Sequence, residues 1–262
     1  MADGEPSDLS VADPVSTSSR VLGVLDLFTE AEPVWTTERM AERLAASRAT
    51  IYRYLQALMA SGFLSQLGGG AYALGPRIIE LDRQMRVADP VLRVAPGVMA
   101  AQRDQVAGTQ LLCRYYGLRV FSIFEERSDP RIRTSFDRGR PFSLFRSSAS
   151  RIILANLPSK HLRRLFLQHA GDIAAAGLGT RWPEFRDLLK AVRKRGVAVA
   201  SDIDTELIGI AAPIFAAPEI ITGSLVLVRI RSEVTDRDTE FLSALALDSA
   251  RQISARLEDA GL

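Results

Sequence analysis

Five side chains that can donate hydrogen bonds recur within one short segment of the chain. They are Ser47, Arg48, Thr50, Arg53 and Gln56. Each can bind a phosphate oxygen or the edge of a nucleic-acid base. Residues 43–79 contain no Asp or Glu, so a polyanion could approach this segment without meeting a carboxylate. The chemistry expected here is recognition of a nucleic acid, with double-stranded DNA as the natural partner.

An amphipathic helical pair would position these donors. Apolar side chains recur at three- and four-residue spacing, the pattern of two helices that each bury one face. They are Met40, Leu44, Ile51, Leu55, Leu58 and Met59. Thr36 or Thr37 can cap the first helix and Ser47 the second. Residues 45–47 leave a short turn, and three glycines at 68–70 separate two strand-like segments. The pattern predicts a winged helix-turn-helix; the alternative is a helical hairpin whose polar face is only solvated.

Composition and charge limit the number of domains and the class of protein that we expect. The chain has 262 residues, of which 47% are hydrophobic, so we expect two domains with a core each. The net charge is only +2, and any DNA affinity must come from local placement of charge. Cys113 is the single cysteine, and no apolar run could span a bilayer. We therefore expect a cytoplasmic protein with no membrane partner, and a polar, acidic, disordered arm at residues 1–16.

The chain divides, on this reading, into a DNA-binding domain at 17–75, a linker helix at 76–90 and a second domain at 91–262. The first domain opens with a helix at 17–29. Strands of the second domain are expected at 109–116, 118–125, 131–136, 141–144, 197–201, 208–215 and 220–231. Helices are expected at 91–106, 147–156, 159–169, 182–195 and 236–260. This order predicts an α+β protein with a mixed sheet flanked by helices.

From Ser18 to the last helix the chain resembles the IclR family of bacterial transcriptional regulators. The segments that carry the resemblance are SSRVLGVLDLF at 18–28, SRATIYRYLQALMASGFL at 47–64, YALG at 72–75, RGRPFSLFRSSASRIILANLP at 138–158, and VRKRGVAVASDID and GIAAPI between 192 and 214. The resemblance implies a winged helix-turn-helix joined by a linker helix to a GAF-like α/β domain. It also implies an effector-binding role for the second domain, and assembly as a homodimer or homotetramer.

The resemblance places the DNA contacts on the recognition helix and its surroundings. The residues implied are Ser18, Ser19, Arg20, Thr37, Ser47, Arg48, Thr50, Arg53, Tyr54 and Tyr72. Arg48 and Arg53 are the candidates for base or phosphate contacts, because Arg can pair bidentately with guanine or with a phosphate. Tyr72 would either pack inside the wing or lie along the groove.

A small-molecule pocket is implied between the sheet and the helix that begins near residue 147. Its candidate residues are Arg131, Arg133, Arg146, Ser147, Ser148, Ala149, Asp202, Asp204 and Gly209. Backbone N–H groups of Ser148 and Ala149 could hold an anionic head group, and the opposite wall would be Asp202 or Asp204 together with the strand that starts at Gly209. Arg131 or Arg133 would project inward. Arg-rich surroundings, and an aromatic wall that Phe121, Phe124, Phe142 and Phe145 could form, favour an organic, aromatic carboxylic acid as effector. The alternatives are that these rings belong to the core and that the serines form a helix cap without a ligand.

An enzyme is the main competing class. A hydrolytic triad could be composed from Ser148, His161 and Asp202, yet no nucleophile elbow, P-loop or dinucleotide-binding motif accompanies them. Spacing typical of zinc ligands is absent from the sequence. We expect no enzymatic activity, no metal and no cofactor.

Other regulator families are nearer alternatives. A GntR-type regulator of fatty-acid metabolism would have an all-helical second domain, and a LysR-type regulator would begin its helix-turn-helix closer to residue 1. We therefore expect a ligand-responsive regulator of catabolic genes, bound to a palindromic operator, with RNA polymerase as a further candidate partner. A dimer would present two recognition helices to two half-sites, and the linker helix would set their separation.

Overall fold

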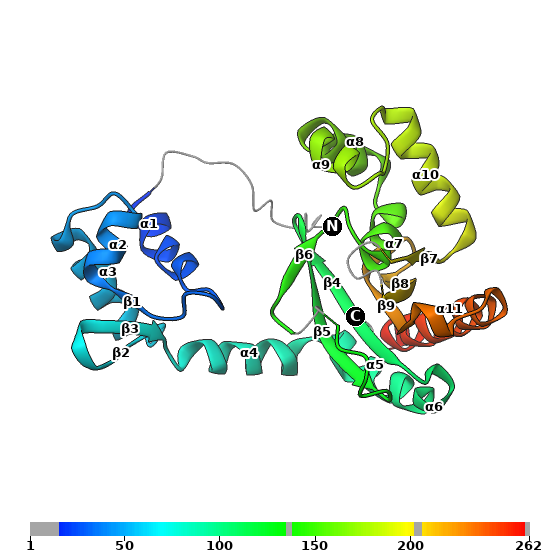
Figure 1. The fold of residues 1–262 in the computed structure, drawn as a ribbon, viewed down its shortest axis with the longest axis horizontal. Coiled ribbons are helices and arrows are strands. Elements are labelled where there is room, and N and C mark those ends of the chain that lie inside the picture. The colour runs from blue at the N-terminus through cyan, green and yellow to red at the C-terminus, as the bar shows by residue number, and fades with distance from the viewer. Residues whose placement is uncertain (1–15, 135–137, 202–205, 260–262) are drawn as a thin grey trace. The chain divides into compact units, whose positions relative to one another are not determined.

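The computed structural model describes residues 16–134, 138–201 and 206–259. The chain separates into two compact units between Asp89 and Pro90, and each is described by itself (Figure 1). Nearly all of the arm predicted at 1–16 lies outside the described residues, as do Asp202 and Asp204. No helix in the described parts is long and apolar enough to cross a membrane.

The first unit packs short helices against a three-stranded sheet. Its elements are α1 (Thr17–Gly23), a 3-10 turn (Leu25–Leu27), β1 (Trp35–Thr36), α2 (Thr37–Arg43), α3 (Arg48–Ala60), β2 (Leu64–Gln66), a second 3-10 turn (Gly68–Gly70), β3 (Ala71–Leu74) and α4 (Arg77–Ala88). β3 lies between β1 and β2 and is antiparallel to both. The predicted winged helix-turn-helix is confirmed.

Apolar residues of α2 and α3 make the core of this unit. Met40, Ile51 and Leu55 are fully buried, together with Val24 from the end of α1. Burial of a side chain of this size stabilises the fold by roughly 1.5–3 kcal/mol relative to exposure. The apolar residues whose spacing predicted these two helices therefore also pack them together.

The opening helix is shorter than predicted. α1 ends at Gly23, and Leu25–Leu27 forms a 3-10 turn where the sequence pattern favoured further α-helix up to residue 29. Ser16 caps the helix by accepting a hydrogen bond from Ser19 N at 3.2 Å. Because the chain turns at Val24, that side chain reaches the core and the regular helix stops.

The second unit is a six-stranded sheet with helices on both faces. Its helices are α5 (Pro90–Ala101), α6 (Arg103–Val106), α7 (Ser148–Asn156), α8 (Ser159–Gln168), α9 (Ala170–Ala175), α10 (Trp182–Arg195) and α11 (Asp236–Asp259). Its strands are β4 (Thr109–Tyr116), β5 (Arg119–Arg127), β6 (Pro141–Ser143), β7 (Ala198–Ala200), β8 (Leu207–Ala217) and β9 (Ile220–Ile230), and a 3-10 turn follows at Arg231–Glu233. The strand order is β6-β5-β4-β9-β8-β7.

Alternating side chains divide the core of this unit into two layers. Leu111 and Cys113 of β4 pack with α7 and α10, whereas Leu112 between them packs with α5 and α11. Strand residues point alternately to opposite faces, so a sheet covered on both sides reads as a continuous apolar run. Figure 1 shows α7 and α11 on opposite sides of β8 and β9.

Two predictions for this sheet were wrong. Every strand pair among the described residues is antiparallel, so the sheet is not mixed. The strand predicted at 131–136 is absent from its described part, because Asp129 and Pro130 start a turn. The Asp129 carboxylate accepts a hydrogen bond from Arg131 N at 2.9 Å, and Ile132 N donates to Asp129 O at 3.2 Å. Such Asx turns divert the backbone from strand pairing.

Helix boundaries differ in smaller ways. The helix predicted at 91–106 breaks at Gln102 into α5 and α6, and α9 was not anticipated. Gln102 is 7% exposed, and its amide oxygen accepts a hydrogen bond from Ser249 of α11. α11 ends its described part at Asp259.

Candidate nucleic-acid interface and ligand site

One face of α3 is turned to solvent. Arg48, Tyr52, Arg53 and Gln56 are exposed along it. The buried residues of the same helix are Ile51, Tyr54, Leu55 and Leu58. The prediction had assigned Tyr54 to the outer face and had passed over Tyr52, although the spacing of Ile51, Leu55 and Leu58 places Tyr54 with them. Tyr52 is 53% exposed and joins the candidate interface.

Ser47 and Thr50 hold the start of α3. Ser47 Oγ accepts a hydrogen bond from Thr50 N at 3.2 Å and lies 2.9 Å from Thr50 Oγ1. The two hydroxyls thus engage each other, and the cap satisfies one of the amides that a helix leaves free at its first turn. The remaining amides and the helix dipole make this end suitable for a phosphate.

Three residues predicted to contact DNA are buried in the first unit. Thr37, Tyr54 and Tyr72 are 3%, 6% and 3% exposed, respectively. Tyr72 is paired with Trp35 across β1 and β3, in agreement with the packing alternative. A side chain enclosed in the core cannot reach a groove, so these three residues are removed from the candidate interface.

Some arginines of the first unit lie beside a carboxylate and others do not. Arg39 lies 2.6 Å from Glu32 and stacks over the Trp35 ring at 4.4 Å, and Arg48 lies 3.8 Å from Glu38. Within the described residues, Arg20, Arg43 and Arg53 have no acidic partner. Ser18, Ser19 and Arg20 are exposed at the start of α1, as the DNA contact implied for them requires.

The wing ends in three glycines without a charged side chain. Gly69 and Gly70 have positive φ of 72° and 74°, which glycine adopts at little cost. Leu67 N donates to Ala71 O at 2.7 Å and closes the turn. Any contact between this tip and a nucleic acid would come from backbone groups, because the three glycines have no side chains.

In the second unit, Ser147 and Ser150 cap the N-terminus of α7. Ser147 has a positive φ of 88°, a strained conformation for a residue with a side chain. Its Oγ accepts a hydrogen bond from Ser150 N at 3.2 Å, and Ser150 Oγ donates to Ser143 O at 2.8 Å. Ser147 and Ser150 therefore act as the Ser-rich cap that sequence reasoning gave as the alternative to a ligand site.

Ser148 and Ala149 complete the first turn of α7. They are 4% and 2% exposed, and among the described residues no backbone acceptor outside the helix binds their amides. Ser148 also faces β8: a methyl group at Gly209 would approach Ser148 Oγ to 2.7 Å. The structure thus places Ser148 beside Gly209, with a helix N-terminus against a side-chain-free position of the sheet, whereas Asp202 and Asp204 of the predicted opposite wall lie outside the described residues.

Buried hydroxyl groups add polarity to the α7 side of the sheet. Thr109 shares a sheet face with Leu111, which packs with α7, and Thr134 follows Ile132 of the same cluster. Thr109 is fully buried and Thr134 is 7% exposed, and in the described structure neither Oγ1 has a hydrogen-bond partner. A buried hydroxyl without a partner costs free energy unless a ligand or water satisfies it. Sequence reasoning missed both, since a strand threonine carries no ligand signal.

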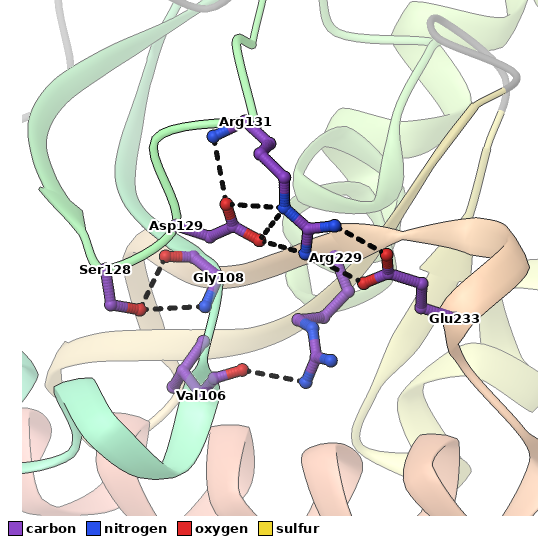
Figure 2. A network of polar contacts seen from close by, with 7 residues as sticks. All are labelled: Val106, Gly108, Ser128, Asp129, Arg131, Arg229 and Glu233. Atoms are coloured by element: carbon purple, nitrogen blue, oxygen red, sulfur yellow. Dashed lines mark hydrogen bonds and ion pairs between the residues drawn. The ribbon is translucent and has the colours of Figure 1, made fainter.

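The arginines predicted to face the pocket do not face it. Arg131, Arg133 and Arg146 are exposed, and Ile132 between the first two is buried instead. Figure 2 shows the Arg131 guanidinium between two carboxylates, 2.7 Å from Asp129 and 2.8 Å from Glu233. This ion pairing lowers the pKa of Asp129. The inward-facing residues of this segment are therefore Ile132 and Thr134, one position away from the predicted Arg131 and Arg133.

The surroundings of Arg131 are structural contacts between chain segments. Arg229 donates to Val106 O at 3.0 Å, and Ser128 Oγ accepts from Gly108 N at 2.8 Å (Figure 2). These contacts join the end of β5 to the ends of α6 and β9. Arg131 is thereby committed to carboxylates of its own chain, and an anionic ligand near α7 would depend on backbone amides.

The predicted aromatic wall is only half present on this side of the sheet. Phe142 and Phe145 pack with the α7 cluster. Phe124 belongs to the opposite layer, and Phe121 pairs with Arg114, which alternates to the same opposite face. Strand alternation separates the two pairs of rings.

Asp202 and Asp204 fall outside the described residues, so the choice between them stays a prediction. The same applies to the hydrolytic triad, which includes Asp202. Among the described residues no group of three or more His, Cys, Asp or Glu side chains is placed to hold a metal ion.

Comparison with known proteins identifies the family to which the two domains belong. The model of the IclR helix-turn-helix domain matches residues 18–68, and that of the C-terminal domain of the bacterial transcriptional regulator IclR matches residues 115–255. The chain belongs to the IclR family of bacterial transcriptional regulators. It is a ligand-responsive regulator of the IclR type, with a DNA-binding helix-turn-helix and an effector-binding domain.

Relatives cover nearly the whole chain. The HTH-type transcriptional regulator KdgR of Escherichia coli is 22% identical over 261 residues, which are 94% of each chain. The crystal structure of an IclR regulator from Alicyclobacillus acidocaldarius has a TM-score of 0.75 at 22% identity and covers 92% of this chain and 98% of its own. An IclR homologue from Microbacterium hydrocarbonoxydans, complexed with 4-hydroxybenzoate, has a TM-score of 0.72 at 19% identity and covers 93% and 100%. These two structures show that the IclR fold is shared.

Proposed function

We propose that this regulator controls catabolic genes by binding a palindromic operator in response to a small carboxylic acid, with an aromatic acid as the first candidate. The observation that carries the effector proposal is the start of α7, where the amides of Ser148 and Ala149 lie in a buried turn opposite Gly209. Amides at a helix N-terminus bind carboxylates well, because the helix dipole favours negative charge there.

Three further observations favour this effector class. Thr109 and Thr134 have buried hydroxyls without a partner in the described structure, so a ligand with a second polar group could satisfy one of them. Phe142 and Phe145 lie in the same cluster as α7. A relative of the same fold is complexed with 4-hydroxybenzoate, a ring with a carboxylate at one end and a hydroxyl at the other.

A homodimer or a pair of dimers would bind the two halves of the operator. α4 supports such an assembly, because none of its residues is buried and Ile79 and Val87 are 75% and 65% exposed. These exposed apolar side chains are available to pack against a second copy of the chain. A ligand that stabilises one arrangement of α4 would change the separation of the recognition helices, and operator affinity with it.

The protein would act in the cytoplasm, and an operator-bound dimer would then either exclude RNA polymerase or recruit it. Neither role needs a cofactor or a catalytic step. The competing hydrolase function predicts turnover of an ester substrate, which an assay of purified protein for ester hydrolysis would detect.

Thermal unfolding of the purified protein in the presence of a carboxylic-acid panel tests the effector proposal. The panel pairs 4-hydroxybenzoate with 4-hydroxybenzyl alcohol, and aliphatic acids with their amides. A ligand that binds the native state raises the melting temperature, by an amount equivalent to about 2.7 kcal/mol at 100 times its Kd. We expect acids, and not the matched neutral compounds, to raise it. Equal shifts for the neutral compounds, or no shift with any acid, would contradict the proposal.

A further inference from the structure

We infer that Ala49, Tyr52 and Gln56 of α3 form the sequence-reading stripe of this protein, and that Gln56 selects adenine in each half of the operator. The inference deepens the proposed function and rests on it, since it concerns what the DNA-binding helix reads. The spacing of these residues, i, i+3 and i+7, places them along one line of a helix. All three are exposed.

Three other polar residues at the start of the helix have partners within the chain. Ser47 and Thr50 are engaged in the N-cap, so their hydroxyls fix the helix start instead of reaching outward. Arg48 lies beside Glu38 at 3.8 Å. These contacts leave the middle of the exposed face, from Ala49 to Gln56, to meet the edges of the bases.

The length of the stripe suits a short half-site. Seven residues of helix rise by about 10 Å, which corresponds to roughly three base-pair steps of about 3.4 Å each. The helix can therefore present one side chain to each of about three successive base pairs in the major groove.

Each side chain of the stripe has a base edge that matches its chemistry. Gln56 has no hydrogen-bond partner among the described residues, so its amide is available to donate and accept together. A glutamine pairs bidentately with N6 and N7 of adenine. The Ala49 methyl group and the Tyr52 ring offer apolar contact to the thymine methyl group. The stripe thus favours A·T pairs.

Arg53 borders the stripe on the adjacent row of the helix. It has no acidic partner within the described residues, and its long side chain can extend past the base edges to the backbone. We assign it a phosphate contact, which adds affinity for every sequence without selecting one.

Selection of bound sequences from a random double-stranded library tests the assignment, with the full chain and with Gln56→Ala, Gln56→Arg and Ser47→Ala. We expect the unaltered protein to enrich a two-fold symmetric site rich in A·T pairs. Gln56→Ala should remove the adenine preference at one symmetric pair of positions and weaken binding to the best site about tenfold or more. Gln56→Arg should change the preference at that pair to guanine.

Two controls separate reading from folding. Gln168→Ala, at the end of α8 in the other unit, should leave both affinity and preference unchanged. Ser47→Ala should weaken binding to all sequences alike, because it removes a cap and not a base contact. An unchanged preference in both Gln56 variants, with melting temperatures equal to that of the unaltered protein, would overturn the assignment while leaving DNA binding intact. No enriched sequence with the unaltered protein would instead contradict the proposed function itself.

Discussion

Ser148 Oγ lies so close to Gly209 that a methyl group at position 209 would approach it to 2.7 Å. This contact joins the first turn of α7 to β8, and it lies where the effector is proposed to bind. A carbon atom and a hydroxyl oxygen do not pack at 2.7 Å. A side chain at position 209 would therefore displace the Ser148 hydroxyl or the strand. The contact explains why a glycine occupies this position of the strand.

Gly209→Ala should therefore alter the ligand site. We expect overpacking to lower stability by about 1–3 kcal/mol, and to abolish the rise in melting temperature that carboxylic acids cause. Thermal unfolding with and without the acids measures both effects. Gly171→Ala in α9 is the matched control, since nothing lies within 4 Å of the added carbon. A Gly209→Ala protein that keeps the full ligand shift would show that this contact lies outside the site.

Arg53→Ala should weaken operator binding through the loss of phosphate contacts. The plot of log K against log salt should lose about 0.9 in slope for each phosphate contact removed. Fluorescence anisotropy with a labelled operator, at several salt concentrations, measures the slope. Arg186→Ala, at an exposed ion pair of α10, serves as the control. An unaltered slope and affinity for Arg53→Ala would remove this residue from the interface.

Glu184 should make stability depend on pH in the acid range. Its carboxylate accepts hydrogen bonds from Arg181 Nε at 2.7 Å and from Thr180 N at 3.0 Å, and these lower its pKa from 4.5 to about 2. A depressed native pKa stabilises the fold above the unfolded value, and this contribution is lost as pH falls from 4.5 towards 2.

The variant Glu184→Gln isolates that contribution. At pH 7 its melting temperature should lie below that of the unaltered protein, and the two values should converge as the pH is lowered to 2. Asp187→Asn on the same helix is the matched variant that removes a carboxylate elsewhere. A Glu184→Gln difference that stays constant between pH 7 and pH 2 would show that the carboxylate makes no such contribution.

Cys113 should be inert in the native protein. It is 1% exposed, and burial raises the pKa of its thiol to about 12. Since the thiolate is the reactive form, a disulfide reagent at pH 8 should label no cysteine in the folded chain and one per chain in denaturant. Rapid stoichiometric labelling of the folded protein would mean that the strand opens readily or that Cys113 is accessible.

Local pattern was sufficient for most elements of this fold. Apolar spacing predicted α2 and α3, and Gly196 marks the end of α10 as expected, with φ of 77°. The same spacing would have placed Tyr54 in the core beside Ile51 and Leu55, so that error was avoidable. The prediction that Ser148 and Gly209 lie on facing sides of a ligand site came from the family resemblance and not from the residues themselves.

Long-range contacts determined what local pattern missed. In the segment from Arg131 to Thr134, side chains of alternate residues point to opposite sides. The local sequence alone does not decide whether the two arginines or Ile132 and Thr134 face the core. Glu233, distant in sequence, draws Arg131 outward and thereby turns Ile132 into the core. The unpartnered hydroxyls of Thr109 and Thr134 are likewise recognisable only once the neighbouring strands and helices are in place.

The most direct test of the account is operator binding by the full chain, measured by anisotropy with and without an effective carboxylic acid, for the unaltered protein and for Ser148→Asp. We expect the acid to change the operator affinity of the unaltered protein. The Ser148→Asp protein should bind the operator with unaltered affinity and ignore the acid, because its added carboxylate occupies the α7 N-terminus. A Ser148→Asp protein that responds to the acid like the unaltered one would contradict effector binding at the N-terminus of α7.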